Sequence, residues 1–557
     1  MTDGQKFNRL PVEVEQSYDA LPRSKLTMGI DLGTTNSCVA VVEDDFPKVI
    51  PTRKGQRTTP SIVALDEKGR LLVGEDARKQ LLINPINTIY GAKRFIGRTF
   101  YSKEAEALSR HFSYAILPLG DMAIGAKIGG HVFSLPQVSA MILNEMRRSV
   151  CEYFKQNVVQ AVISVPAYYT ENQRAAVREA GRIAGLDVVR IINEPTAAAL
   201  AYGLNKDYDK RVLVYDLGGG TFDASLLQVF DNSFRVLATG GDTFLGGVDF
   251  DERVVDHLLA EYERIEKEIL QCDSVITQRL KDAAERSKIE LSSKSTSLID
   301  LPYITIAQSH FKDFKLEIDR ARLNDLTEDL VARTISVCEE VLLAAGVKPD
   351  AVDAVLLVGG QTRMPLVVER VTRFFGKPPT KGVHPDEVVA CGAALMGYSL
   401  GRDTSVRLID VLPLSIGGRQ PSGDFKVFFP ANNTLPAERE IGVATTRDQQ
   451  TEIEIFLYQG ESQRAAENEY LGSFVISGFP RLPKGQIKLA VKLSLNQESI
   501  LELTARSLSG DHVIEVRVNT KEPTAPEVER KPEGPPAPAV ETRRFSGLRG
   551  FIRRISF

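Results

Sequence analysis

Short apolar runs alternate with longer helical patterns along the chain from about residue 27 to residue 402. Runs of branched apolar residues predict buried strands, for example at 161–165, 212–216 and 354–358. Apolar residues at helical spacing predict helices, for example at 171–185, 249–270 and 274–291. Strands that alternate with helices are typical of α/β domains, so we predict an α/β unit over 27–402.

The pattern changes after the segment 403–410, which we interpret as a linker. Beyond it, apolar and polar residues alternate without helical stretches, and Gly, Pro and Asn separate the alternating stretches. These stretches lie at 427–430, 451–459, 472–479, 486–495, 499–507 and 512–518. Short strands at regular spacing predict an antiparallel β-sandwich over 411–519.

Both ends of the chain depart from the pattern of a folded domain. Residues 1–26 lack the apolar core of a secretory signal, and we interpret them as a flexible extension. Pro and Glu dominate 520–540, which predicts a disordered linker. In 541–557 arginines are interleaved with apolar residues. This tail fits a basic amphipathic helix that contacts an anionic membrane or a protein groove, and it equally fits a basic tail with no fixed partner.

Composition narrows the function classes. A chain of 557 residues is too long for one hydrophobic core and predicts roughly three or four domains. The formal net charge of −4 argues against general nucleic-acid binding. The five cysteines show no CxxC or Cys/His ligand spacing, so we expect reduced thiols rather than a disulfide framework or a zinc site. No apolar run approaches the length of a membrane span, and we expect a cytoplasmic protein.

The turn Asp-Leu-Gly occurs twice, in DLGTTNS at 31–37 and in DLGGGTFD at 216–223. Strand-like stretches precede and follow both copies, which predicts two β-hairpins with an aspartate at the mouth of each. Backbone N–H groups and hydroxyls of such a turn attract anions. An aspartate beside a phosphate repels it unless a hard cation such as Mg²⁺ lies between them. Two copies therefore suggest two halves that hold one nucleotide.

Five motifs together carry a resemblance to a known family. They lie at 30–37, 165–174, 192–203, 216–223 and 356–365. The chain from about 27 to 519 resembles the 70-kilodalton heat-shock protein family of ATP-driven chaperones, in particular its bacterial DnaK type. The resemblance implies an α/β actin-like two-lobed ATPase domain that binds ATP or ADP with Mg²⁺. An antiparallel β-sandwich peptide-binding domain would follow it.

The resemblance assigns roles to residues of the two hairpins and to two motifs between them. Phosphate contacts are implied for Thr34, Thr35, Asn36, Gly218, Gly219, Gly220 and Thr221. Asp31 and Asp216 would hold Mg²⁺ mainly through its waters. Lys93 would be the catalytic lysine at the γ-phosphate, and Glu194, Asp223 and Thr221 would complete the catalytic group. Taken without the family, Lys93 is more typical of a solvated surface lysine.

A second set of implied residues contacts the base and the ribose. It comprises Gly359, Gly360, Arg363, Asp386, Glu285, Lys288 and Ser292. The last three are spaced at i, i+3 and i+7 and share one side of a helix. Without the family this side is an ordinary solvated helix face.

Communication between the domains is implied for Pro166, Arg174 and Asp410, and docking of a J-domain co-chaperone for Arg190 and Asn193. Pro166 is equally an ordinary strand terminator. A GrpE-type nucleotide-exchange factor is a further implied partner. In the linker, Arg407 stands where relatives carry an apolar residue. Either its side chain reaches solvent or the coupling between the domains is altered.

The β-sandwich is expected to bind an extended apolar peptide through Ile416, Pro421, Thr446 and Ile453. Three other apolar residues lie on nearby strands, namely Phe428, Ile455 and Phe456. The alternative is that these side chains form core, which we favour for Phe428 and Phe456. Relatives carry a helical lid after the sandwich, whereas 520–557 is too short and too rich in proline for one. We therefore expect faster peptide release.

Three functions remain as hypotheses. The first is an ATP-dependent chaperone that binds extended apolar segments of unfolded proteins. The second is an ATP-sensing regulatory adaptor for a dedicated client or a membrane surface, with little general folding activity. The third is a small-molecule kinase of the same lobed fold, which the linker and the β-domain disfavour.

Overall fold

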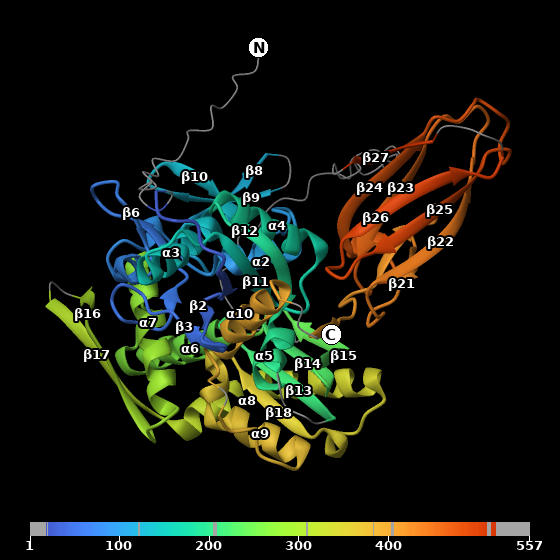
Figure 1. Ribbon diagram of the computed structural model, residues 1–557. Helices are drawn as coiled ribbons and strands as arrows, with labels where there is room; N and C mark the ends of the chain where they lie inside the picture. The colour runs from blue at the N-terminus through green and yellow to red at the C-terminus, as the bar shows by residue number, and fades with distance from the viewer. Residues whose placement is uncertain are drawn as a thin grey trace, which may run out of the picture.

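The computed structural model describes most of the chain as two α/β lobes and a β-domain (Figure 1). The described residues are Tyr18, 20–120, 123–203, 209–307, 310–382, 384–402, 406–509 and 514–519. Within these ranges, no helix combines the length and the apolar character that crossing a bilayer requires. The predicted linker 520–540 and the predicted tail 541–557 lie outside them.

Lobe I is built on a sheet with the strand order β12-β11-β1-β2-β3. These strands are β1 (Thr27–Asp31), β2 (Asn36–Glu43), β3 (Phe46–Val49), β11 (Gln160–Val165) and β12 (Asp187–Asn193). The turn DLGTTNS joins β1 to β2, which pair antiparallel as a hairpin. Helices α3 (Leu135–Phe154) and α4 (Glu171–Ile183) each begin with a capping box, which stabilises their first turns.

The rest of lobe I consists of short elements between β3 and α3. Its strands are β4 (Thr59–Pro60), β5 (Val63–Leu65), β6 (Leu71–Val73), β7 (Thr88–Ile89), β8 (Ala115–Leu119), β9 (Ala123–Ile128) and β10 (His131–Ser134). Its helices are α1 (Glu75–Arg78), η2 (Lys79–Leu82), η3 (Pro85–Asn87), η4 (Ala92–Arg94) and α2 (Lys103–Ser109). Ala92, Phe95 and Ile96 are buried in the core of lobe I, which anchors η4 there.

Lobe II repeats this plan with the strand order β18-β13-β14-β15-β19. The strands are β13 (Lys210–Leu217), β14 (Phe222–Phe230), β15 (Ser233–Asp242), β18 (Ala354–Val358) and β19 (Arg407–Ile409). The turn in DLGGGTFD joins β13 to β14, again as an antiparallel hairpin. Both hairpins predicted from the sequence are thus present.

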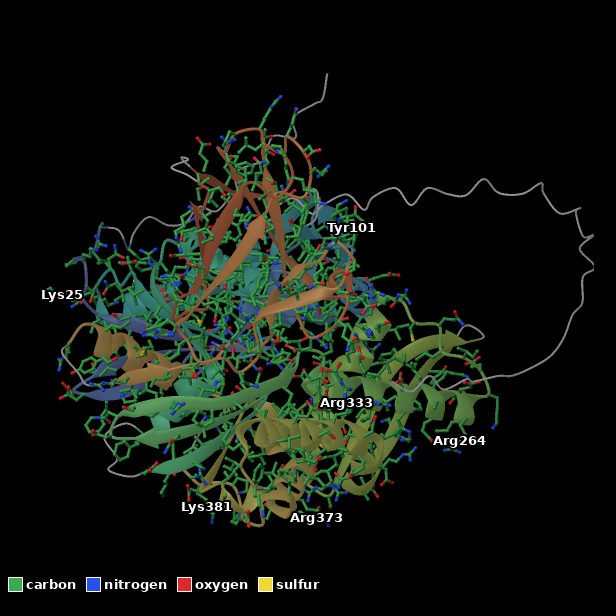
Figure 2. The ribbon with its side chains drawn as sticks, turned by 90° about the vertical axis from the view of Figure 1, so that its right-hand side faces the viewer. Lys25, Tyr101, Arg264, Arg333, Arg373 and Lys381 are labelled. Carbon is green, nitrogen blue, oxygen red and sulfur yellow. The ribbon has the colours of Figure 1, made fainter. Side chains whose placement is uncertain are left out.

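The helices of lobe II lie outside its sheet, and a long two-stranded hairpin projects beyond them (Figure 1). The elements are α6 (Gly247–Glu266), α7 (Ser274–Leu291), β16 (Thr296–Ala307), β17 (His310–Asp319), α8 (Arg320–Ala345), η5 (Pro349–Ala351), η6 (Gly360–Arg363) and α9 (Pro365–Phe375). In the view of Figure 2, Arg264, Arg333 and Arg373 project as exposed side chains from α6, α8 and α9.

Two helices cross between the lobes. Helix α5 (Glu194–Gly203) follows β12 of lobe I and packs on β13 and β14 of lobe II. Helix α10 (Val388–Leu400) follows η6 and α9 of lobe II and packs on β1 and β2 of lobe I. They meet backbone to backbone, because a Cβ added to Gly392 would lie 1.8 Å from the carbonyl oxygen of Ala197. A glycine is therefore required at this crossing.

The β-domain consists of two antiparallel sheets with a common core. The strand orders are β21-β20-β23-β24-β27 and β22-β25-β26. The bounds are β20 (Ile416–Arg419), β21 (Phe425–Phe429), β22 (Ala437–Ala444), β23 (Ile453–Gln459), η7 (Ala465–Glu467), β24 (Glu469–Ser477), β25 (Lys488–Leu495), β26 (Leu501–Ser507) and β27 (Glu515–Asn519). Strands β20 and β22 are additional to the stretches identified from the sequence.

The β-domain is docked on both lobes. Strand β19, in the predicted linker, pairs parallel with β15 and extends the sheet of lobe II. The backbone of Arg407 takes part in this pairing while its side chain is exposed. Asn432 of the β-domain accepts a hydrogen bond from the backbone N–H of Thr239 at 2.9 Å. The structure thus answers the question about Arg407: the guanidinium is not buried.

Part of the N-terminal extension contacts lobe I. The hydroxyl of Tyr18 donates a hydrogen bond to Glu152 Oε1 on α3 at 2.5 Å. The backbone N–H of Ser24 donates to the carbonyl oxygen of Asn157 at 3.0 Å, and that of Asn157 donates to Pro22 at 2.9 Å. The described part of the segment that we expected to be flexible is therefore held against the end of α3.

Candidate functional site

A cavity of about 680 Å³ lies between the two lobes and is lined by both glycine hairpins. Most of the residues that the sequence suggested for nucleotide binding line it. These are Asp31, Thr34, Thr35, Asn36, Lys93, Glu194, Asp216, Gly218, Gly219, Thr221, Glu285, Lys288, Ser292, Gly359, Gly360, Arg363 and Asp386. Two predicted residues, Gly220 and Asp223, do not line it.

The two hairpins face each other across this cavity at close range. A Cβ added to Gly219 would lie 2.1 Å from Thr35 Oγ1, and one added to Gly220 would lie 2.8 Å from Thr34 Cγ2. Only glycine fits between the hairpins at Gly219, where any side chain would displace Thr35. Backbone N–H groups and threonine hydroxyls therefore converge on one small volume, as an anion site requires.

Buried carboxylates surround the same volume. Burial, followed by the charge of Glu194, raises the pKa of both Asp31 and Asp223 to about 7. The same two causes raise the pKa of Asp216 well above its ordinary range. Of these acids, Asp31 and Asp216 line the cavity, and a cation bound beside them would favour their charged forms.

Asp31 and Asp216 both line the cavity and are carboxylates available there to a hydrated cation. In the described part of the chain, no group of three or more Asp, Glu, His or Cys side chains is close enough to ligate one metal ion together. Mg²⁺ keeps several of its waters when bound to proteins, so it needs few direct protein ligands. Asp31 and Asp216 are thus suited to hold Mg²⁺ through water, as the sequence suggested.

Lys93 is buried and ion-paired. Its Nζ lies 2.7 Å from Glu194 Oε1, and the two side chains are 7% and 8% exposed. Burial opposes the charge of Lys93, but the attraction of Glu194, Tyr169 and Asp31 outweighs it and raises the pKa of Lys93. The hydroxyl of Tyr169 donates to the carbonyl oxygen of Lys93 at 2.9 Å. The alternative of a solvated surface lysine is therefore wrong.

Asp223 lies behind the cavity wall. Its Oδ1 accepts a hydrogen bond from the backbone N–H of Tyr168 at 3.1 Å, and the side chain is buried. Asp223 can therefore influence a ligand in the cavity only through neighbouring side chains, one of which is Glu194.

The other end of the cavity carries the residues suggested for adenosine. Arg363 Nη2 lies 2.6 Å from Asp386 Oδ2. Lys288 is buried and pairs with Asp251 Oδ1 at 2.8 Å, so the solvated-face alternative is wrong for Lys288. Sequence reasoning missed Asp251, which also lines the cavity. No local pattern pointed to it, because the acidic residue in the first turn of α6 is Asp249 and Asp251 lies beyond that turn.

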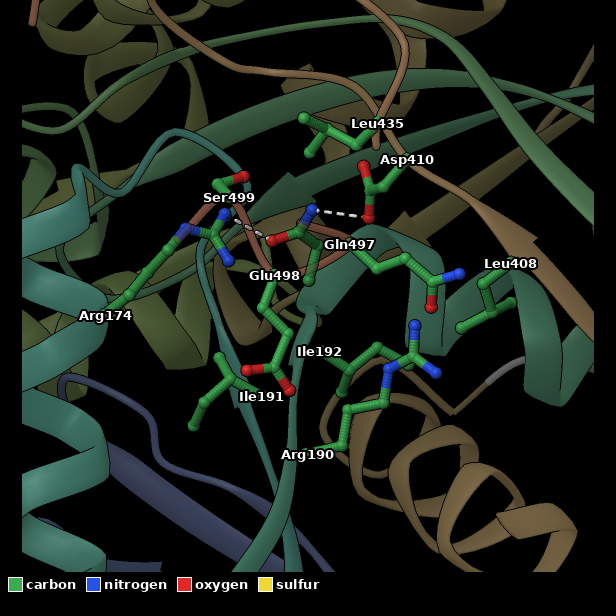
Figure 3. Close-up of a pocket in the computed structure, with 11 residues that line it drawn as sticks. Arg174, Arg190, Ile191, Ile192, Leu408, Asp410, Leu435, Gln497, Glu498 and Ser499 are labelled. Atoms are coloured by element: carbon green, nitrogen blue, oxygen red, sulfur yellow. Dashed lines mark hydrogen bonds between the residues drawn. The ribbon is translucent and has the colours of Figure 1, made fainter. Parts of the chain in front are cut away.

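Two of the three predicted relay residues, Arg174 and Asp410, line a small pocket between lobe I, the linker and the β-domain, together with Arg190 and Asn193 (Figure 3). Arg174 Nη2 donates to Asn193 Oδ1 at 2.6 Å, and Asn193 Nδ2 donates to Asp410 Oδ2 at 2.7 Å. Arg190 lines the same pocket, facing Glu498 of the β-domain. Pro166 is buried at the end of β11, where the strand-terminator interpretation remains open.

The start of α4 forms the adjacent interdomain contact. Thr170 Oγ1 and Asn172 Nδ2 both donate to Glu469 Oε1, at 2.9 and 3.0 Å. The backbone N–H of Glu171 donates to Gln459 Oε1 at 3.1 Å. Burial raises the pKa of Glu171 to about 7, against the attraction of Arg174. A carboxylate thus lies in a poorly solvated interface.

The predicted peptide contacts divide into two groups. Ile416 and Ile453 are 1% and 9% exposed and belong to the β-domain core. Pro421 and Thr446 are exposed on loops, where Gln450 accepts a hydrogen bond from the N–H of Thr446 at 2.8 Å. Phe428 is also core, as we favoured, whereas Phe456 is half-buried and does not belong to the core.

Comparison with known families gives a match over most of the chain. The model of the family described as Hsp70 protein matches residues 27–533. The match spans both lobes, the linker segment and the β-domain, which together make up most of the chain.

Proposed function

Because the chain belongs to the Hsp70 family, whose members are ATPases, we propose that it is an ATP-driven chaperone that binds extended apolar segments of unfolded proteins. The observation that carries the proposal is the buried Lys93–Glu194 pair at a cavity that both glycine hairpins line. A buried ion pair is costly to desolvate and contributes little net stability, so its position beside an anion site favours a chemical role.

The residues around the cavity divide the chemistry of hydrolysis among them. Thr34, Thr35 and the glycines of the second hairpin hold the phosphates through hydroxyl and N–H groups. The ammonium of Lys93 lies where charge develops at the γ-phosphate, and Glu194 orients the attacking water. When bound, Mg²⁺ supplies further neutralisation of phosphate charge, with Asp31 and Asp216 holding its waters.

Nucleotide state would reach the β-domain through the docked linker. Opening or closing of the lobes changes the surface of lobe I that carries Arg174 and Asn193, and Asn193 is bonded to Asp410. The same movement acts on β15, to which β19 is paired. Both contacts support control of peptide affinity by ATP binding and hydrolysis.

Finer assignments belong to the same proposal. We place the protein with the bacterial DnaK type in the cytoplasm, working with a J-domain co-chaperone at Arg190 and Asn193 and with a GrpE-type exchange factor. Ile416, Pro421, Thr446 and Ile453 would contact peptide, which requires the β-domain to rearrange, because Ile416 and Ile453 are buried in the docked form.

Single-turnover ATP hydrolysis tests the proposal. The rate should rise with unfolded peptides of varied sequence and with a J-domain protein, and it should fall to a small residual rate in Lys93→Ala. Lys68→Ala, which removes an exposed lysine of lobe I, is the matched control and should behave as the unaltered protein. A rate indifferent to both peptide and J-domain protein would reject the chaperone and leave the adaptor.

A further inference from the structure

The turn that carries Lys93 belongs to lobe I but is bonded to lobe II. Ala92 and Phe95, on either side of Lys93 and Arg94, are buried in the lobe I core. The side chains of Arg94 and Arg98 instead form hydrogen bonds with the segment 243–249, Arg94 with Asp249 and Arg98 with Thr243. That segment links β15 to the start of α6 in lobe II.

Arg94 forms a partly buried ion pair across the lobes, in which the Asp249 side chain is 21% exposed. Arg94 Nη2 lies 3.2 Å from Asp249 Oδ1, and the Arg94 side chain is 5% exposed. The guanidinium stem passes Gly220, where an added Cβ would lie 3.1 Å from Arg94 Cδ. Because exposed and buried ion pairs alike contribute little net stability, the clearest effect of this pair is to fix the geometry of the two segments it joins.

The segment that receives Arg94 is itself bonded to the second phosphate hairpin. Asp249 Oδ2 accepts from the N–H of Gly246 at 2.7 Å, which holds the start of α6. The N–H of Gly247 donates to Gly218, and that of Val248 donates to Gly219, both at 2.9 Å. Arg94 is thus connected to the backbone of the hairpin through its ion pair with Asp249 and the hydrogen bond that the neighbouring Val248 donates to Gly219.

Arg98 adds a second connection beside the first. Its Nε donates to the carbonyl oxygen of Arg94 at 3.0 Å, and its Nη2 donates to Thr243 Oγ1 at 3.0 Å. Its guanidinium lies 4.7 Å from the centre of the Phe244 ring. Both arginines therefore hold the Lys93 turn against the same stretch of lobe II.

We infer that Arg94 and Arg98 are positioning residues for ATP hydrolysis, which align Lys93 of lobe I with the phosphate hairpin of lobe II only when the lobes are closed. The inference rests on the proposed ATPase function. The hairpin that would hold the phosphates belongs to lobe II, whereas the ammonium of Lys93 that acts on them belongs to lobe I. The relative position of phosphates and ammonium therefore depends on the contacts between the lobes. When the lobes separate, the Asp249 and Thr243 contacts break and Lys93 moves away from the hairpin with lobe I.

Two mild substitutions on the lobe II side test this in the full-length protein. Thr243→Val removes the acceptor of Arg98 with little change of shape, and Asp249→Asn removes the charge that pairs with Arg94 but keeps an oxygen for Gly246. Arg110→Gln is the control, since it breaks an ion pair with Glu106 whose partners are 74% and 72% exposed. Single-turnover hydrolysis, equilibrium ADP binding and thermal unfolding are measured for each variant.

We expect Thr243→Val and Asp249→Asn to lower the hydrolysis rate by about ten- to hundredfold, because small displacements of a catalytic group have effects of this size. ADP affinity should change little, because Thr243 and Asp249 are not among the residues that line the cavity. In a Lys93→Ala background, neither substitution should lower the residual rate further.

Two results would overturn the inference while the proposed function stands: unchanged rates in both variants, or rate losses that follow losses of ADP affinity or thermal stability. If the unaltered protein hydrolyses no ATP, the proposed function and the inference fail together.

Discussion

Glu171 makes docking of the β-domain depend on pH. It is the first residue of α4, its Oε2 is buried without a hydrogen-bond partner, and its backbone N–H is bonded to Gln459 of the β-domain. Burial raises the pKa of its carboxyl group to about 7, and Glu498 of the β-domain contributes in the same direction. When the β-domain leaves, the carboxyl group regains solvent and its pKa returns toward the ordinary value of 4.5.

The direction follows from the raised pKa. Below about pH 4.5 the group is protonated in both states and docking is unaffected. As pH rises toward 7, the undocked state releases a proton that the docked state keeps, so docking weakens and the loss is complete above about pH 7. The full difference between the ordinary and the raised pKa of Glu171 corresponds to about 3 kcal/mol of free energy. Lobe I itself provides part of the burial, which leaves about 1–2 kcal/mol for docking.

The neutral substitution Glu171→Gln should therefore stabilise docking at pH 8 by about 1–2 kcal/mol, roughly a five- to thirtyfold shift in the docking equilibrium. Hydrogen exchange of the backbone amides of 406–411 measures this equilibrium, because β19 is protected only while it pairs with β15. The unaltered protein should exchange faster at pH 8 than at pH 5.5 after correction for intrinsic rates. Glu171→Gln should remove most of that difference.

Glu179→Gln is the matched control on the same helix. Glu179 is paired with Arg182 near the exposed end of α4, where removal of its charge should leave exchange of the linker unchanged. An equal pH dependence in Glu171→Gln and in the unaltered protein would refute the reasoning, since the titrating group would then lie elsewhere.

Three further predictions concern other parts of the molecule. Gly392→Ala should lower the free energy of unfolding by about 1–3 kcal/mol in a thermal unfolding assay, because the added Cβ would overlap the carbonyl oxygen of Ala197. Gly442→Ala is the control and should have little effect in the same assay, because the space around Gly442 is open. Asp410→Asn should weaken the link to Asn193, which would abolish stimulation of hydrolysis by peptide while the basal rate persists. Chelation of Mg²⁺ should lower ATP affinity measured by equilibrium binding and stop hydrolysis, and a normal rate in excess chelator would contradict the assignment of Asp31 and Asp216.

Local features of the fold could be predicted from the sequence. The hairpins at 31–37 and 216–223 were recognisable, because glycine turns between apolar runs are specified by neighbouring residues. Strands β20 and β22 were missed, because Gly417 and Gly418 interrupt the first and three consecutive exposed charged residues, 438–440, interrupt the alternation of the second. Pairing with neighbouring strands, rather than local pattern, makes both of them strands.

Long-range contacts decided what the sequence left open. Nothing near Lys93 in the chain indicates burial, because its partner Glu194 lies on α5, about a hundred residues later. Arg407 looked unfavourable in a docked linker because the sequence does not reveal which face of a short strand is covered. In the structure β19 lies at the sheet edge and its first residue points to solvent, so the arginine is compatible with docking.

The crossing of α5 and α10 has a mechanical consequence. Each of these helices follows an element of one lobe in the chain and packs on the sheet of the other lobe. At their closest point the two backbones are in direct contact, with no side chain between them. Because no side chain interlocks the two helices at this point, they can rotate relative to each other about their crossing without repacking side chains there. The lobes would then rotate at low energetic cost around Gly392, and the resistance to opening would come from contacts at the rim of the cavity.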